Sequence, residues 1–362
     1  MPITSGESKA FTGLKTVVMY RPVSGNSAGS FGTMPVGPGS TNPSYWPGYV
    51  KSFNASHDVE VQAVYGMSCL GGSSRSNPRD QKAGKQSFGW DATIIPQTDS
   101  RTALPYYSMK HLWSCAHSTF AGVYGTSDAS AVRCATTGTT TASEQDYIQF
   151  YRVNLESEAT TLGGRGLLVQ GAQIADYEMS CSIDNPVEIS ISGPALSLST
   201  GISDLFGSIE NSSYATCITE AAIYWNDTDI SIGVPSGAFV GGVPSGKNGN
   251  NVKAWSYKKS TSMTPNYRMT SNATTMTKPW CISQGKTTFE VKLTLDFESW
   301  EEYNAMANGT ATDIYFFFPG TEYIVVRDVL WSGAPINTDA DADDLVGIEL
   351  TGMGEGAAFL VT

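Results

Sequence analysis

The sequence has little of what most enzymes use for chemistry. Its 362 residues include 3 histidines, His57, His111 and His117, and only 15% of the residues are charged. A nucleophilic triad needs a histidine placed beside a serine or cysteine, and only composition hints at such a pair. The sequence also has no GxxxxGK[ST] phosphate loop and no GxGxxG string that connects a predicted strand to a helix. We therefore predict no catalytic residue, no cofactor site and no enzyme activity.

The 6 cysteines are widely spaced and include no CxxC pair, which disfavours a zinc ribbon or a thioredoxin-like motif. They are Cys69, Cys115, Cys134, Cys181, Cys217 and Cys281. The N-terminus lacks the apolar segment of a signal peptide, so we expect reduced, mostly buried thiols, with disulfides as the alternative. Cys115, His117 and Cys134 do not supply four correctly spaced zinc ligands, and we predict no metal site there.

The densest acidic cluster is Asp339, Asp341, Asp343 and Asp344. A calcium-binding loop of the EF-hand type needs glycine at its sixth position and glutamate at its twelfth, where this sequence has Asp344 and Leu350. We favour a solvated acidic turn, and binding of a cation by this cluster stays open.

The charge balance argues against a protein that grips nucleic acid. The formal net charge is -12, and the largest basic cluster is Lys258-Lys259. Binding to phosphates needs lysine and arginine, whereas an acidic surface lets DNA pass without sticking. No apolar run of about 18 residues occurs, so we predict no membrane span. The abundance of Gly, Ser and Thr favours strands joined by turns.

The clearest local pattern lies in residues 285–309. Its apolar residues alternate with polar ones, as in a strand with one buried face: Phe289, Val291, Leu293, Leu295 and Phe297 alternate with Thr288, Glu290, Lys292, Thr294 and Asp296. Ser299 and Glu302 form a capping box, and Asn308-Gly309 ends the predicted helix. We expect a strand followed by a short helix.

Further strands are predicted along the first half of the chain. They cover residues 15–21, 49–53, 59–67, 84–96, 147–153, 167–170, 177–183 and 187–192. Residues 22–48 are predicted to form a long loop or hairpin, and residues 105–115 a helix that begins at Pro105.

The second half repeats this order. Gly84-Lys85 and Phe88 recur as Gly285-Lys286 and Phe289 at an offset of 201, and VKSF at 50–53 recurs as VKAW at 252–255 at an offset of 202. Residues 187–193 match 346–352 at an offset of 159, and the loop 22–48 matches 226–251. The sequence thus predicts a tandem duplication of one β-rich domain, with a first domain at 1–198, a linker at 199–213 and a second domain at 214–362. Such copies usually build a larger pseudosymmetric assembly.

The repeated unit resembles the major tail tube proteins of long-tailed bacteriophages, of the type in which one chain carries two tube domains. The resemblance rests on SFGWDATIIPQTDSRTALPYYSMKHLW and GAQIADYEMSCSIDNPVEISISG in the first copy. In the second copy it rests on GKTTFEVKLTLDFESWEEYNAMANG and LVGIELTGMGEGAAF.

The resemblance implies a mainly β fold with two tandem β-sandwich or barrel domains, each with a flanking helix and a long loop or hairpin. It implies homotrimers that form pseudo-hexameric rings and stack into a hollow tube in the virion tail. The expected partners are further copies of the chain, the tail terminator, the tape measure and distal tail proteins. Double-stranded DNA would pass through the lumen without sequence-specific binding, and the loops 22–48 and 226–251 would bridge subunits or rings.

The carboxylates Glu188, Glu290, Asp296 and Glu349 are candidates for the channel wall. Two other functions stay open from the sequence. One is a virion decoration, fibre or adhesin protein whose tandem β-sandwich domains display loops to a receptor. The other is a hydrolase of β-sandwich fold, for which no acid pair or triad is found.

Overall fold

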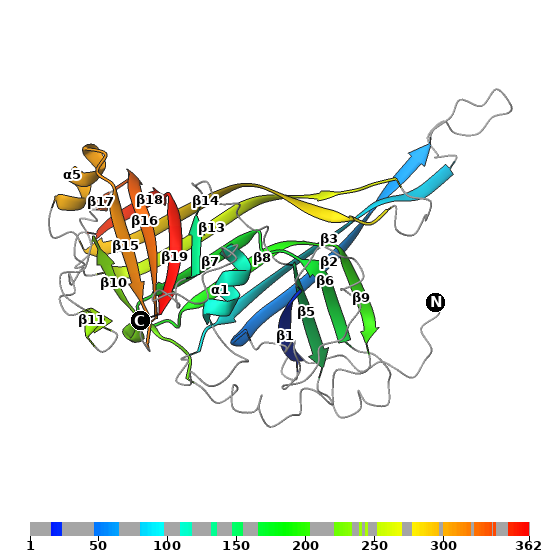
Figure 1. The fold of residues 1–362 in the computed structure, drawn as a ribbon, viewed down its shortest axis with the longest axis horizontal. Helices are drawn as coiled ribbons and strands as arrows, with labels where there is room; N and C mark the ends of the chain where they lie inside the picture. Colours follow the sequence, from blue (N-terminus) through cyan, green and yellow to red (C-terminus); the bar gives the residue numbers. More distant parts are fainter. Residues whose placement is uncertain are drawn as a thin grey trace.

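The structure is a computed structural model of the chain. It describes residues 16–23, 47–64, 80–97, 109–117, 132–135, 147–154, 166–202, 221–233, 239–240, 243–244, 252–269, 277–296, 300–319, 322–334, 336–337 and 347–361. Within these ranges the chain is mainly β, with strands joined into antiparallel sheets and two short α-helices (Figure 1).

The elements fall into two series, which we call the first half (β1 to β9) and the second half (β10 to β19). The first half contains β1 (Thr16–Val23), β2 (Tyr49–Val64), β3 (Asp80–Ile95), α1 (Met109–His117), β4 (Val132–Ala135), β5 (Tyr147–Asn154), β6 (Gly166–Ala172), β7 (Asp176–Ser182), β8 (Glu188–Ala195) and β9 (Ser197–Ile202). The second half contains the 3-10 helix η5 (Trp225–Asp227), β10 (Asp229–Ile232), β11 (Phe239–Val240), β12 (Val243–Pro244), β13 (Val252–Asn266), β14 (Cys281–Asp296), α5 (Glu301–Ala307), β15 (Thr312–Phe317), β16 (Glu322–Gly333), β17 (Ile336–Asn337), β18 (Gly347–Gly354) and β19 (Gly356–Val361).

The alternation of apolar and polar residues explains these strands. Along β7, Tyr177, Met179 and Cys181 are buried, while the residues between them are partly exposed. The same pattern runs along β14, where the apolar residues from Phe289 to Leu295 are buried. One face of each strand therefore enters the core and the other stays polar.

In each half two layers of strands meet through their apolar faces. In the second half both layers belong to one sheet, because β16 pairs with β15 and β19 in one layer and with β18 in the other. In the first half, β1-β5-β6-β9 form one sheet and β7-β8-β3-β2 lie side by side in another. Phe150 of β5 packs against Trp90 of β3, with ring centroids 4.4 Å apart, and against Phe53 of β2 at 5.8 Å. In the second half, Trp255 of β13 packs against Phe316 of β15 at 4.9 Å. These contacts join the layers into one core.

The strand pairings of the first half recur in the second half. β3 pairs with β2 and β8, and β14 pairs with β13 and β18. Both long hairpins have register shifts at positions related by an offset of 202: Val50/Ser52 and Val59/Val61 in the first half, and Val252/Ala254 and Thr261/Met263 in the second. Phe88 lies opposite Ala195 in one half and Phe289 opposite Gly354 in the other. The correspondence therefore extends to the register of single residues and to β-bulges, which are specific local features of a strand pair.

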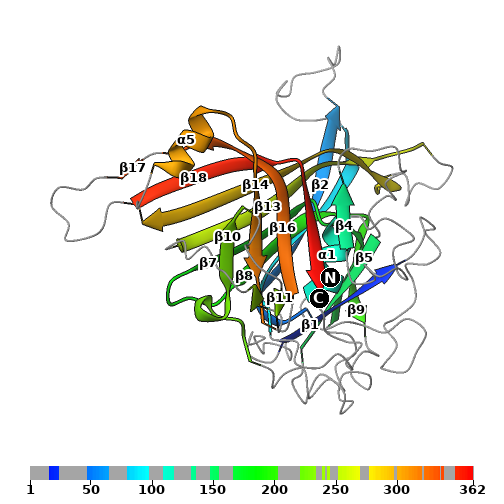
Figure 2. The same cartoon turned by 60° about the vertical axis from the view of Figure 1, so that its left-hand side comes forward.

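The two halves join through a strand pairing that we call the internal seam. Residues 254–260 of β13 lie antiparallel to residues 182–176 of β7. This pairing links four strands of each half into the continuous sheet, in the order β17-β18-β14-β13-β7-β8-β3-β2, with the end of β16 also paired to β18 (Figures 1 and 2).

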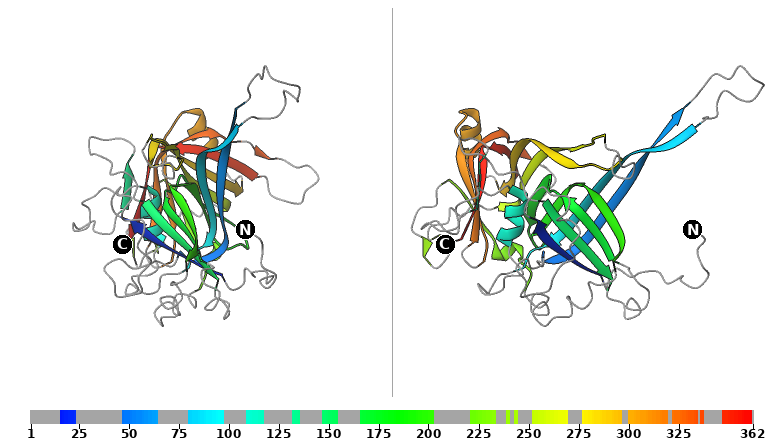
Figure 3. Two further views of the ribbon diagram at one scale, coloured as in Figure 1. Left: turned by 90° about the vertical axis from the view of Figure 1, so that its right-hand side faces the viewer. Right: turned by 45° about the vertical axis from the view of Figure 1, so that its right-hand side comes forward.

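The two long hairpins of the continuous sheet extend beyond its body, and β2 and β3 run farthest (Figure 3). The hairpins touch each other where they leave the body. The Gln86 N–H donates to the Thr277 carbonyl at 2.7 Å, and the Tyr267 hydroxyl donates to the Gln86 carbonyl at 2.7 Å. Lys85 Nζ lies 5.3 Å from the centre of the Tyr267 ring.

Several predicted elements differ from the structure. The strands expected at 49–53 and 59–67 are one strand, β2, because it pairs with β3 from Tyr49 to Val64. The polar residues that suggested a break are tolerated because β2 is an edge strand. The predicted loop 226–251 is partly wrong, since it contains most of η5 together with β10, β11 and β12, while residues 24–46 of the equivalent loop lie outside the described residues.

The bounds of the two helices differ from the predicted ones. The first is described from Met109 to His117, with residues 105–108 outside the described part of the chain, and the second starts at Glu301. Trp300 is the N-cap of the second helix and its side chain makes no capping hydrogen bond; Ser299 and the side chain of Glu302 lie outside the described residues, so the capping box stays a prediction. The predicted stop is confirmed. Gly309 has φ +62°, and its N–H and that of the next residue donate to the Met306 and Ala305 carbonyls.

The predicted division of the chain at residues 199–213 falls partly on β9, which runs to Ile202 and pairs with β6. Residues 203–220 lie outside the described part of the chain. The domain boundary therefore stays a prediction.

Candidate functional site

The candidate site is the polar face of the continuous sheet, opposite the core. Residues directly opposite one another in a sheet point to the same side, so the register defines rows across the strands. Three of these rows are Thr351–Lys292–Ser256–Ser180–Glu188, Met353–Glu290–Lys258–Glu178–Ser190–Thr93, and Thr288–Ser260–Asp176–Ser192–Asp91–Asn54. Hydroxyl and charged side chains dominate all three rows, and they cross the internal seam without a break.

The four predicted wall carboxylates belong to this face. Glu188, Glu290 and Asp296 are half-buried and Glu349 is exposed. Glu349 lies opposite Thr294, which stands two residues from Lys292 on the same side of β14. The structure therefore places all four carboxylates on one side of the sheet, but in separate rows.

Ion pairs organise the charges of the polar face. Lys258 Nζ lies 3.8 Å from Glu178 Oε2 across the internal seam, and Lys292 Nζ lies 2.8 Å from Glu290 Oε1. The hydrogen bond and the charge of Glu290 raise the pKa of Lys292. Exposed ion pairs of this kind stabilise a protein by less than about 1 kcal/mol, so their main effect is to neutralise lysines on an otherwise acidic face of the sheet.

The bulges at Val50/Ser52 and Val252/Ala254 place a lysine at the same point of each half. Lys51 Nζ lies 2.6 Å from Glu188 Oε1, and Lys253 Nζ lies 2.7 Å from Asp296 Oδ1. Both lysines sit at register shifts, where a strand carries one residue more than its partner. The equivalent bulges thus place a cation beside a carboxylate at the same end of each half.

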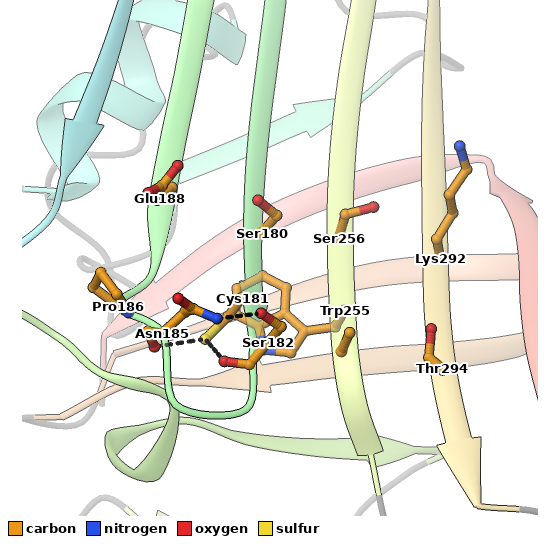
Figure 4. A pocket seen from close by; sticks show the side chains of 11 residues that line it. Ser180, Cys181, Ser182, Asn185, Pro186, Glu188, Trp255, Ser256, Lys292 and Thr294 are labelled. Carbon is orange, nitrogen blue, oxygen red and sulfur yellow. Dashed lines mark hydrogen bonds between the residues drawn. The ribbon is translucent and has the colours of Figure 1, made fainter. Parts of the chain in front are cut away.

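A shallow pocket of about 400 Å³ opens on the polar face at the internal seam (Figure 4). Ser180, Ser256 and Lys292 line it from three strands, and Asn185 Nδ2 donates to Ser182 Oγ at 2.9 Å. Cys181 lies beneath the pocket, and burial raises its pKa to about 11. Its thiol therefore stays protonated at neutral pH and is a poor nucleophile.

The histidines do not gather at this face. His57 stacks on Phe88 on β2 and β3, with ring centroids 4.6 Å apart. His117 lies at the end of α1 and is 1% exposed. The side chain of His111 is not among the described parts of the chain. The two described histidine rings thus lie on the core side and do not form a site with the serines of the polar face.

His117 takes part in a buried hydrogen-bond chain. Its Nδ1 lies 2.9 Å from the Trp113 carbonyl, which can only accept, so Nδ1 carries the hydrogen. Nε2 then accepts from the Tyr257 hydroxyl at 2.7 Å. Burial is the main cause that holds the pKa of His117 well below its usual value, and the positive charge of Lys259 lowers the pKa further. The chain links α1 of the first half to β13 of the second.

The continuous sheet has two open edges. At one end is β2, whose side away from β3 pairs with no described strand. At the other end the sheet continues from β18 through β16 to β15 and β10, and β17, which pairs with β18 through two residues, has no described partner on its other side. Apolar side chains are exposed near both edges: Val59 and Val61 on β2, and Leu330 and Met353 near the end of β16 and β18. Such edges can template pairing with another chain.

Sequence reasoning missed the internal seam and the His117 chain. The predicted helix ended at residue 115 and the next predicted strand began at residue 147, yet His117 closes α1 and Val132–Ala135 forms β4, which pairs with β19. The signal in the sequence was present, since Met109, Trp113 and His117 follow one another at helical spacing. The acidic cluster at 339–344 lies outside the described residues, so the cation question stays open. Among the thiols, Cys115 and Cys181 are buried and Cys281 is half-buried.

No helix in the described parts of the chain is long and apolar enough to cross a membrane. No protein-family model matches the sequence, and no curated protein matches it.

Proposed function

We propose that the protein is a structural subunit that joins copies of itself edge to edge into closed rings, as in a bacteriophage tail tube. The chain is then a tandem duplication of one β-sandwich unit with a flanking helix. The observation that carries this proposal is the internal seam, in which β13 of the second unit pairs with β7 of the first. Because β2 corresponds to β13 and β17 corresponds to β7, the same pairing between two chains would join the two open edges.

The internal seam supplies the register of this contact. Tyr257 lies opposite Met179. The residue equivalent to Tyr257 is Ala55 of β2. The residue equivalent to Met179 is Ile336 of β17, because Ile336 lies opposite Ile348 just as Met179 lies opposite Ile189. The expected contact therefore sets Ala55 of one chain opposite Ile336 of the next.

The same register extends the pairing by one more hydrogen bond. The Thr261 N–H donates to the Ala175 carbonyl at 2.8 Å at the end of the internal seam. The equivalent donor on the open edge is the N–H of Val59, and the equivalent acceptor is the carbonyl of Ser332. Pairing there would cover Val59, whose side chain is 42% exposed, and burial of this side chain would add a hydrophobic contribution to the strand pairing.

A contact between two different edges is heterologous, and such contacts form rings when the rotation closes. The resemblance to duplicated tail tube proteins sets the ring at three chains, which supply six similar units. The continuous sheets of the three chains then form one barrel, and such closure removes every open edge. The two hairpins that extend from the sheet would reach neighbouring rings.

The polar face would line the channel, since the opposite face is buried in the core. On this face carboxylates outnumber lysines, and the lysines lie beside carboxylates. Phosphates would find no continuous basic surface there, so double-stranded DNA could slide through without specific binding. The tape measure protein would occupy the same channel before ejection, and the terminator and distal tail proteins would close the two ends of the tube.

Electron microscopy of the purified chain over a range of concentrations tests this proposal. Rings or tubes with a central channel are the expected result, with multi-angle light scattering giving a trimer or its multiples. Monomers that persist at every concentration would contradict it. Binding to glycans or cells by such a monomer would support the alternative of a decoration, fibre or adhesin protein.

A further inference from the structure

Helix α1 covers the internal seam. Trp113 is fully buried, with its ring centre 5.4 Å from Tyr177 of β7 and 5.1 Å from Tyr257 of β13. It also lies 5.9 Å from Phe359 of β19. The hydrogen bond from Tyr257 to His117 adds a polar contact across the same boundary. One helix of the first half therefore packs on strands of both halves at the point where they join.

Helix α5 holds the corresponding place in the second half. It follows β14 as α1 follows β3, and in Figure 1 it lies at the far left end of the second half, whereas α1 lies between the two halves. Its inner side packs on the core through Ala305 and Met306. Its outer side carries Trp300, 55% exposed, and Tyr303, 38% exposed, whose rings make an edge contact at 5.5 Å.

This contrast has a simple physical origin. Large aromatic side chains gain most when they are buried, and the equivalent helix buries its aromatic residue completely. What covers α1 from the second half is β13, through Tyr257, together with β19, through Phe359. Beside α5 the described residues contain no further unit, and the aromatic side chains on its outer side stay exposed.

We propose that α5 covers the seam between two copies of this chain, with Trp300 and Tyr303 packed against β2 and β3 of the second copy. The inference rests on the proposed function, because it needs the open edges to pair. The second copy presents a suitable surface: the position of Tyr257 is taken by the smaller Ala55, and that of Lys259 by His57, which is exposed and stacked on Phe88. Ala55 thus leaves room for a large side chain of the helix, and the His57 ring offers a flat surface beside it.

A photo-crosslinking experiment tests the contact directly. Tyr303→benzoylphenylalanine protein is prepared unlabelled and mixed with wild-type protein labelled with ¹⁵N, allowed to assemble and irradiated. Mass spectrometry should find position 303 of the unlabelled chain joined to a labelled peptide from residues 49–64 or 80–95. The same mixture irradiated below the assembly concentration is the control and should give no mixed-isotope product.

A second variant measures the energetic importance of the contact. Trp300→Ser should raise the concentration needed for half-maximal assembly by roughly tenfold or more, the effect of losing one well-buried aromatic at an interface. Trp225→Ser is the matched control, because Trp225 is 42% exposed on η5, outside α5 and the two open edges, and should assemble like the wild type. Both variants should keep the melting temperature of the unassembled protein, since the replaced side chains are exposed.

The outcomes separate the two proposals. Rings or tubes that form while position 303 crosslinks only within its own chain, or to other surfaces, would overturn the role of α5 and leave the proposed function intact. Normal assembly of Trp300→Ser would do the same. Wild-type protein that never assembles would overturn the proposed function and the role of α5 with it.

Discussion

Replacement of Ala55 by proline tests the edge-to-edge pairing most directly. At the end of the internal seam, Thr261 donates its N–H to the carbonyl of Ala175, the residue before β7, and alternate residues of a strand point their backbone groups to the same side. Tyr257 therefore faces β7 as well, and its equivalent, Ala55, directs its N–H to the open edge. Proline at position 55 removes this donor but leaves the hydrogen bonds between β2 and β3 in place.

The size of the effect follows from the internal seam. Seven residues of β13 pair with β7, and Tyr257 is the middle one. A backbone hydrogen bond contributes about 1 kcal/mol net, and the proline ring also keeps the neighbouring strand away, so each seam should lose about 2 kcal/mol. This loss corresponds to roughly a 30-fold higher concentration for half-maximal assembly.

Sedimentation of Ala55→Pro across a concentration series measures this shift. Ala55→Ser is the matched control, because it keeps the N–H and nearly the same size, and it should assemble like the wild type. The melting temperature of unassembled Ala55→Pro should fall by less than about 4 °C, since proline is tolerated on edge strands whose N–H faces solvent. Wild-type assembly by a correctly folded Ala55→Pro protein would refute the pairing of β2 with a second chain.

Two further predictions concern the stability of the unassembled chain. Because burial and Lys259 lower the pKa of His117 in the folded state, the unfolded chain binds a proton first as the pH falls below about 6.5, and stability should drop by up to about 1.4 kcal/mol per pH unit. Denaturant unfolding of wild type and His117→Gln across this range should show this slope only for the wild type; equal slopes would contradict a buried neutral imidazole. Gly193→Ala should destabilise the chain by about 3 kcal/mol, because the added methyl would overlap the Gln173 carbonyl oxygen. Gly333→Ala, where the methyl meets open space, should change stability by less than about 1 kcal/mol, and a similar loss in both variants would argue against a specific overlap.

The two hairpins show how far local pattern carries. Alternation along β14 identified its buried and polar faces residue by residue, since side chains of a strand point to opposite sides whatever the strand pairs with. The offset of 202 between VKSF and VKAW was also visible in the sequence, and the structure adds that the bulges recur at the same offset. In β2 the same approach failed, because an edge strand can carry polar residues on both sides and so loses the periodic signal.

The sequence by itself therefore determined the mainly β character of the chain, the polar face of its strongest strand and the constant offset between its two long hairpins. All of these depend on neighbours in the chain. Only the tertiary structure decided which strands pair, because β7 and β13 meet across more than 70 residues and no local pattern names a partner. The tertiary structure alone also decided that α1 buries Trp113 against β7 and β13, while α5 leaves Trp300 and Tyr303 exposed, since burial depends on what lies opposite each helix.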